Sequence, residues 1–107
     1  MREVDLESFA AAHADGATVI DVRELHEYIA GHVCGARLIP MGQLATRLAE
    51  VPTTGPVYVI CASGVRSLSA ADFLSGAGVD AWSVAGGTGG WRRSGRGVVA
   101  GMRERVS

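Results

Sequence analysis

The 107-residue sequence predicts an α/β fold with a mainly parallel sheet covered by helices on both faces. Two segments, residues 17–22 and 57–60, are short, mainly apolar and rich in β-branched residues, as strands buried on both faces of a parallel sheet are. Segments with helical spacing of apolar residues alternate with such strands. Hydrophobic residues make up 48% of the chain and charged residues 20%, which is typical of a folded globular protein.

The first half of the chain contains two predicted helices and two predicted strands. Asp5 is placed to cap a helix over residues 6–13. The strand over 17–22 follows, and residues 23–30 are predicted to form a short helix that ends at Gly31. A second strand is expected at 37–39, before a proline that cannot donate a ladder hydrogen bond.

The second half of the chain continues the alternation. The spacing of two leucines predicts a helix over residues 43–50. The apolar strand at 57–60 leads into a loop, and a helix is expected from residue 67 to about 77. A last strand is predicted at 81–84. Because active sites of parallel α/β sheets lie beyond the carboxyl ends of strands, we expect the active site in the loop after residue 60.

Length and charge indicate one domain over residues 1–107, with a core at about 4–95 and a basic C-terminal tail at 96–107. Residues 1–90 carry ten acidic side chains and five arginines, whereas 91–107 carry five arginines and one acidic side chain. We interpret the tail as a solvated, partly frayed terminus. Trp91 is the one aromatic residue of the basic segment 91–107, so nucleic-acid binding is not expected. No apolar run approaches the ~20 residues needed to span a bilayer, and the acidic start is unlike a signal peptide, so we expect no membrane association and a cytoplasmic location.

The two cysteines, Cys34 and Cys61, are too few for a disulfide framework. The three histidines and two cysteines show no spacing typical of a structural zinc site, so no metal is expected. The chain has no lysine, which excludes lysine Schiff-base chemistry. A cysteine in such a protein is either inert core filling or a reactive nucleophile, and its surroundings decide which.

The surroundings of Cys61 favour a nucleophile. A loop between a strand and a helix directs backbone N–H groups into the space above the strand, and the helix N-terminus adds its positive dipole end. Gly64 can adopt positive φ, which allows the loop to curl so that successive amides surround an anion. Arg66 adds a permanent charge and can bind a carboxylate that holds the loop. The alternative is a buried structural cysteine next to an ordinary turn.

Three motifs resemble those of the rhodanese family. Residues 61–67, Cys-Ala-Ser-Gly-Val-Arg-Ser, match the active-site pattern C-x-x-G-x-R-[ST]. Residues 21–36 resemble the pattern D-V-R-x-x-x-E-[YF]-x-x-G-H-I-x-G-A, and residues 84–95 resemble the closing L-x-G-G…W…G element. The motifs occur in the family's order and cover most of residues 4–95. The resemblance implies a rhodanese-like sheet of about five strands.

The resemblance also implies a function. In such proteins the cysteine thiolate, here Cys61, takes sulfane sulfur from a donor such as thiosulfate and holds it as a persulfide. An acceptor thiol, or cyanide, then removes the sulfur, and no cofactor takes part. The backbone amides of the loop would hold the persulfide anion, and the two residues Asp21 and Arg23 would support the shape of the loop. The loop amides expected to do this belong to Ala62, Ser63, Gly64, Val65 and Arg66.

Some residues depart from the family pattern or leave alternatives open. The side chains of Ala62, Ser63 and Val65 are uncharged where many thiosulfate-using members have basic residues. Residues 88–90 are unusually small, and either they form a flexible rim that suits a protein acceptor or their size has no functional meaning. Cys34 is interpreted as a small apolar loop residue, with a resolving thiol as the alternative. His32 is interpreted as a hydrogen-bonded structural residue rather than a general base, and His13 and His26 as surface residues.

Three other functions compete with a thiosulfate sulfurtransferase. Phosphatases and arsenate reductases of related fold use a loop one residue longer, C-x-x-x-x-x-R, whereas four residues separate Cys61 from Arg66. Non-catalytic regulatory modules of this fold typically lose the cysteine. A sulfur carrier that acts through a protein donor or acceptor, with little thiosulfate activity, shares the persulfide chemistry and stays open.

Overall fold

The computed structural model describes residues 2–105 and confirms the predicted α/β class. Five strands form one sheet in the order β1-β5-β4-β2-β3, and every neighbouring pair in it is parallel. β4 is the central strand and pairs with β2, so their carboxyl ends lie side by side. The strands are β1 (Glu3–Val4), β2 (Thr18–Asp21), β3 (Arg37–Leu38), β4 (Pro56–Ile60) and β5 (Asp80–Val84).

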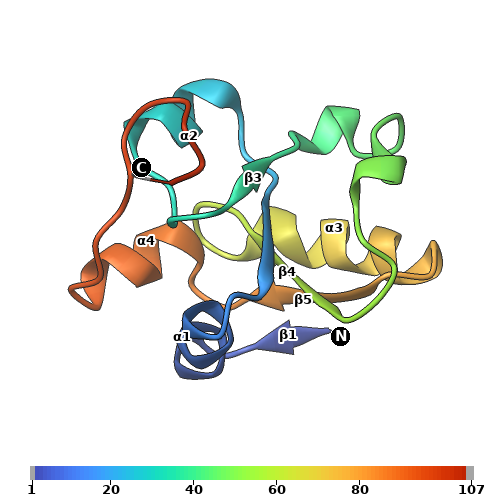
Figure 1. Ribbon diagram of the computed structural model, residues 1–107, viewed down its shortest axis with the longest axis horizontal. Helices are drawn as coiled ribbons and strands as arrows, with labels where there is room; N and C mark the ends of the chain where they lie inside the picture. The colour runs from blue at the N-terminus through green and yellow to red at the C-terminus, as the bar shows by residue number, and fades with distance from the viewer. Residues whose placement is uncertain (1, 106–107) are drawn as a thin grey trace.

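Four α-helices and two short 3₁₀ helices surround the sheet within the described residues (Figure 1). The Asp5 carboxylate accepts a hydrogen bond from the Ser8 amide at 2.7 Å, which confirms Asp5 as the cap of the first helix. None of the described helices is both long enough and apolar enough to cross a bilayer. The helices are α1 (Leu6–Ala14), α2 (Leu25–Ala30), α3 (Val65–Gly76) and α4 (Gly87–Arg93), and the 3₁₀ helices are Met41–Gln43 and Leu48–Glu50.

The core has two layers because side chains alternate between the two faces of each strand. On one face, Val57 and Val59 of β4 pack with Leu74 of α3 and with the segment that contains the 3₁₀ helices. On the other face, Ile60 packs with buried aromatic side chains from α1, α2 and α4, which are Phe9, Tyr28 and Trp91. Both faces are therefore covered, as the apolar strands predicted.

The predicted helix over residues 43–50 is wrong. Only 3₁₀ helices and turns form there. The Thr46 hydroxyl donates to the carbonyl of Gln43 at 3.1 Å, a local bond that competes with helical pairing. A segment of this length has little intrinsic helical stability, so its conformation follows the packing of its leucines on the sheet.

The described tail residues, 96–105, are exposed or half-buried, as expected of a solvated terminus, but several of them are hydrogen-bonded to the domain and are not frayed. After α4 the chain returns past α2 (Figure 1). Val99 pairs with His32 in an isolated antiparallel bridge, and the amide of Gly35 donates to the carbonyl of Glu104. The imidazole of His32 is fully buried and contacts the carbonyl of Arg103 at 2.6 Å. His32 therefore has the structural role expected of it, with the tail as one of its partners.

Candidate active site

Cys61 directly follows β4 in the middle of the sheet and begins the loop that leads to α3. The last residue of β4, Ile60, is in register with Asp21, the last residue of β2. Cys61 therefore lies beyond the carboxyl ends of two neighbouring parallel strands, as the sequence predicts. Its side chain is fully buried.

The loop directs amides at the sulfur. The Gly64 amide donates to Cys61 Sγ at 3.1 Å, and the Ser67 amide donates to it at 3.4 Å. Gly64 has φ +97° and precedes α3 as its N-cap. A Cβ atom there would lie 3.1 Å from the amide nitrogen of Gly86, so both the positive φ and the close backbone approach favour glycine.

These contacts set the ionisation of the thiol. Burial has the largest influence on the pKa of Cys61, and it acts to raise that pKa. Hydrogen bonds from the hydroxyl and amide of Ser67 and from the amides of Gly64 and Ser63 act in the opposite direction. In total they outweigh burial, so the pKa of the Cys61 thiol lies below its ordinary value. The site stabilises the thiolate, which is the nucleophilic form of cysteine.

The first turn of α4 supports the loop from the side. The amide of Thr88 donates to the carbonyl of Cys61 at 2.8 Å, and the amide of Gly89 donates to the carbonyl of Ala62 at 2.9 Å. At Gly87, with φ +58°, a Cβ atom would lie only 2.5 Å from the Cys61 carbonyl oxygen. Of the two alternatives for residues 88–90, a flexible rim does not fit the structure, because all three residues lie in α4 and the amides of Thr88 and Gly89 are hydrogen-bonded to the loop.

Arg66 is held by a carboxylate, Glu27 of α2. Its two terminal nitrogens each donate to one Glu27 oxygen at 2.8 Å. This bidentate hydrogen bonding is the main reason that the pKa of Glu27 falls to about 2. The sequence indicated a carboxylate partner for Arg66 but did not identify Glu27.

Asp21 and Arg23 form a buried ion pair beside the loop. Arg23 Nη2 lies 2.8 Å from Asp21 Oδ2 and also donates to the carbonyl of Gly31 at 2.8 Å. The amide of Val22 donates to the carbonyl of Ile60, the residue before Cys61. The pair thus braces the end of β2 next to the loop, and it also holds the end of α2 through Gly31.

Two hydroxyl groups near the sulfur were not identified as site residues from the sequence. Ser67 Oγ lies 3.4 Å from Cys61 Sγ, and Ser83 Oγ of β5 lies 2.7 Å from Ser67 Oγ. Both serines are fully buried. The final [ST] position of the loop pattern pointed to Ser67, whereas Ser83 is distant in sequence and carried no signal.

Cys34 lies elsewhere. It is exposed, and it shares a hollow with Gly16, Ala17, His13 and Arg105. Gly16 and Ala17 precede β2, whereas Cys61 lies beyond the last residues of β2 and β4. A four-residue strand is about 13 Å long, so the structure places the two thiols at opposite ends of β2. Cys34 lies in a loop, as expected of it, but it is exposed. A role in resolving a persulfide on Cys61 does not fit its position.

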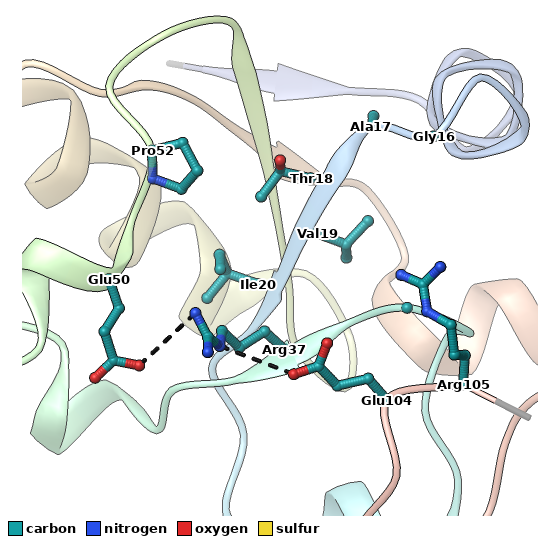
Figure 2. Close-up of a pocket in the computed structure, with 11 residues that line it drawn as sticks. Gly16, Ala17, Thr18, Val19, Ile20, Arg37, Glu50, Pro52, Glu104 and Arg105 are labelled. Carbon is teal, nitrogen blue, oxygen red and sulfur yellow. Dashed lines mark ion pairs between the residues drawn. The ribbon is translucent and has the colours of Figure 1, made fainter. Parts of the chain in front are cut away.

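A cavity of about 240 Å³ lies alongside β2, from Gly16 before the strand to Ile20 (Figure 2). Arg37 lies there between Glu50 and Glu104, with nitrogen–oxygen distances of 4.0 and 3.8 Å. Arg105 lines the same cavity. No residue of the loop 61–67 lines it, so it is separate from the cysteine site.

Comparison with known proteins is consistent with this geometry. Residues 5–94 match the model of the rhodanese-like domain family. YqhL of Bacillus subtilis is 45% identical over 74 residues, which cover 69% of this chain and 58% of YqhL. The thiosulfate sulfurtransferase GlpE of Pseudomonas entomophila is 33% identical over 100 residues, or 92% of each chain. The crystal structure of a rhodanese-related protein from Thermoplasma volcanium superimposes with a TM-score of 0.87 at 31% identity, and the match covers 96% of this chain and all of that one. The chain spans less than two thirds of YqhL but nearly the whole of GlpE, and it belongs to the rhodanese family.

Proposed function

We propose that this protein is a sulfurtransferase that carries sulfane sulfur as a persulfide on Cys61. The observation that supports this best is the pair of amide hydrogen bonds, from Gly64 and Ser67, to a buried sulfur whose thiol pKa is lowered. Such a site favours both a thiolate and the persulfide anion that replaces it. The amides of the loop from Ala62 to Arg66 would hold that anion, and the Asp21–Arg23 pair would brace the loop.

The transfer takes place in two steps. The Cys61 thiolate attacks the outer sulfur of a donor such as thiosulfate, an S–S bond to Cys61 forms, and the S–S bond of the donor breaks. The electron pair of that bond leaves with sulfite. An acceptor thiolate, or cyanide, then attacks the outer sulfur of the persulfide, and Cys61 leaves as a thiolate. Covalent catalysis of this kind divides one difficult transfer into two easier ones.

The persulfide also suits the burial of Cys61. Adding one sulfur lengthens the side chain by about 2 Å, the length of an S–S bond. The transferable atom is therefore further from the strand than Sγ is. The acceptor then needs to reach only the outer sulfur, while the inner one stays among the amides of the loop.

The geometry of Arg66 supports sulfur transfer over phosphoryl transfer. Both of its terminal nitrogens are engaged by Glu27, so the guanidinium is used to hold the loop. A phosphatase loop of this kind needs room for an anion larger than one sulfur atom, and this loop is one residue shorter. The cytoplasm, expected from the sequence, would keep both thiols reduced.

Intact-mass measurement after incubation with thiosulfate tests the proposal. Wild-type protein should gain one sulfur atom, and adding cyanide should remove it. Cys61→Ser should gain none, whereas Cys34→Ser, the matched control, should gain one as wild type does.

Two outcomes would contradict the proposal in different ways. Wild type that stays unmodified with thiosulfate and with a small-molecule persulfide would exclude the persulfide reaction. If wild type gains sulfur from the small-molecule persulfide but not from thiosulfate, thiosulfate is not a donor and the sulfur-carrier alternative is favoured.

A further inference from the structure

A buried chain of three polar side-chain atoms leads from β5 to the reactive sulfur. Ser83 Oγ lies 2.7 Å from Ser67 Oγ, and Ser67 Oγ lies 3.4 Å from Cys61 Sγ. All three residues are fully buried. Within residues 2–105, the Ser83 hydroxyl has the Ser67 hydroxyl as its one hydrogen-bond partner, and the Ser67 hydroxyl has Ser83 Oγ and the Cys61 sulfur.

The lack of other acceptors determines the direction of the hydrogen bonds. The proton of the Ser83 hydroxyl has one acceptor within reach, the Ser67 oxygen. When Ser83 donates to Ser67, the Ser67 proton is left with one acceptor, the sulfur. With a thiolate at Cys61, both hydroxyl protons are then used and the negative sulfur receives a hydrogen bond.

A protonated Cys61 thiol satisfies this series of hydrogen bonds less well than a thiolate does. There are then three protons, from one thiol and two hydroxyls, for two donor–acceptor links. One buried proton is left without an acceptor, which disfavours the thiol. In addition, a hydroxyl that accepts a hydrogen bond becomes a stronger donor, so Ser83 strengthens the bond from Ser67 to the thiolate.

We propose that Ser83 is a positioning residue, whose hydroxyl directs the Ser67 hydroxyl at the sulfur and thereby favours the Cys61 thiolate. Ser83 does not contact the Cys61 sulfur and acts on it through the Ser67 hydroxyl. The proposal deepens the proposed function, since it concerns the nucleophile of the same reaction. It also explains a buried serine on β5, where its neighbours Ala81 and Val84 are apolar.

Titration of the thiolate by its ultraviolet absorbance tests the proposal without any sulfur donor. A Cys34→Ser background leaves Cys61 as the one thiol of the chain. Adding Ser83→Ala should raise the midpoint of the titration, so that the thiolate fraction well below the midpoint falls about threefold. Ser83→Thr keeps the hydroxyl and should restore the wild-type midpoint.

Two further variants separate this role from a general effect of removing a buried hydroxyl. Thr88 is buried, and its hydroxyl has no hydrogen-bond partner within the described residues, although its amide supports the loop. Thr88→Val should leave the midpoint unchanged. In a Ser67→Ala background, Ser83→Ala should have no further effect, because the link to the sulfur is already broken.

The possible results are decisive in each direction. A midpoint unchanged by Ser83→Ala, or raised equally when Ser67 is already alanine, would overturn the proposal. If Ser83→Thr unfolds on heating at a lower temperature because of its extra methyl group, the double-variant comparison alone decides. A failure of wild type to load sulfur would refute the proposed function and leave the titration result standing.

Discussion

The two cysteines of this chain lie at opposite ends of β2 in very different surroundings. Cys61 is fully buried, yet its sulfur accepts two amide hydrogen bonds and lies beside the hydroxyl of Ser67. Cys34 is exposed, and its backbone carbonyl lies 2.7 Å from Nε2 of His13. Exposure alone would rank Cys34 as the more reactive thiol. The hydrogen bonds favour Cys61, because they stabilise the charged form that reacts.

The backbone around the two cysteines differs in the same way. Beside Cys61, glycine is required by backbone atoms that cannot move independently, as at Gly87 against the Cys61 carbonyl. Beside Cys34, a Cβ atom at Gly35 would meet the end of the flexible Arg105 side chain at 3.0 Å. The backbone beside Cys61 therefore has no room for a side chain at Gly87, whereas the Arg105 side chain can move to make room at Gly35.

The largest expected difference between the regions is in stability. Gly87→Ala should lower the free energy of unfolding by at least about 3 kcal/mol, because positive φ and a 2.5 Å contact with Cys61 O act together. Gly35→Ala has a similar positive φ, +87°, but a movable neighbour, and should cost about 1 kcal/mol. Urea denaturation of both variants measures this. Equal losses would show that backbone strain dominates and that contact with the loop adds nothing.

A smaller effect is expected from the ion pair that holds the loop. Glu27→Gln should destabilise the protein by about 1 kcal/mol at neutral pH, since the pair with Arg66 is partly exposed and screened. Because the pKa of Glu27 is lowered to about 2, this stabilisation is complete above the unfolded-state pKa of about 4.3 and is lost as pH falls towards 2.

Thermal unfolding of wild type and Glu27→Gln between neutral pH and pH 2 measures that dependence. The difference between the two proteins should shrink across the acid range. Glu104→Gln is the control near Cys34, because the Glu104 carboxylate lies 3.8 Å from the Arg37 side chain, without the bidentate hydrogen bonds of Glu27. If Glu104→Gln lowered the stability as much as Glu27→Gln does, the bidentate hydrogen bonds of Glu27 would contribute nothing beyond the loss of one negative charge.

The smallest effect concerns capture of the donor. Arg93 of α4 lies over Gly89, where a methyl group would come within 3.0 Å of Arg93 Nη1 and 3.1 Å of the Ala62 carbonyl oxygen. It thus brings positive charge to the edge of a loop whose own variable side chains are neutral. Arg93→Gln should raise the thiosulfate KM about twofold to threefold at low ionic strength, with little change in kcat.

Steady-state kinetics at two salt concentrations measure this effect. Arg105→Gln is the matched control, because it removes the same charge from the Cys34 end of the molecule. If both variants changed KM equally, only the net charge of the protein would matter, and Arg93 would have no local role in donor capture.

Features that depend on neighbours in sequence could be predicted from the sequence. The cap at Asp5, the apolar strand before Cys61 and the positive φ of Gly64 all depend on a few adjacent residues. A glycine between Cys61 and a predicted helix likewise indicated a loop that curls its amides towards Cys61, and the Gly64 amide does donate to its sulfur. Parallel pairing followed from strands that are apolar on both faces.

Other features depended on residues brought together from distant parts of the chain. Residues 43–50 have helical spacing but form 3₁₀ helices and turns, and the glycine-rich residues after β5 form a helix that is hydrogen-bonded to the cysteine loop. The tail is held by Val99 and Gly101 through hydrogen bonds to residues near α2. Ser83 reaches the sulfur only because β5 pairs with β4 in the sheet. In each case the deciding hydrogen bond or contact joins residues distant in sequence, and a local pattern carries no information about such a partner.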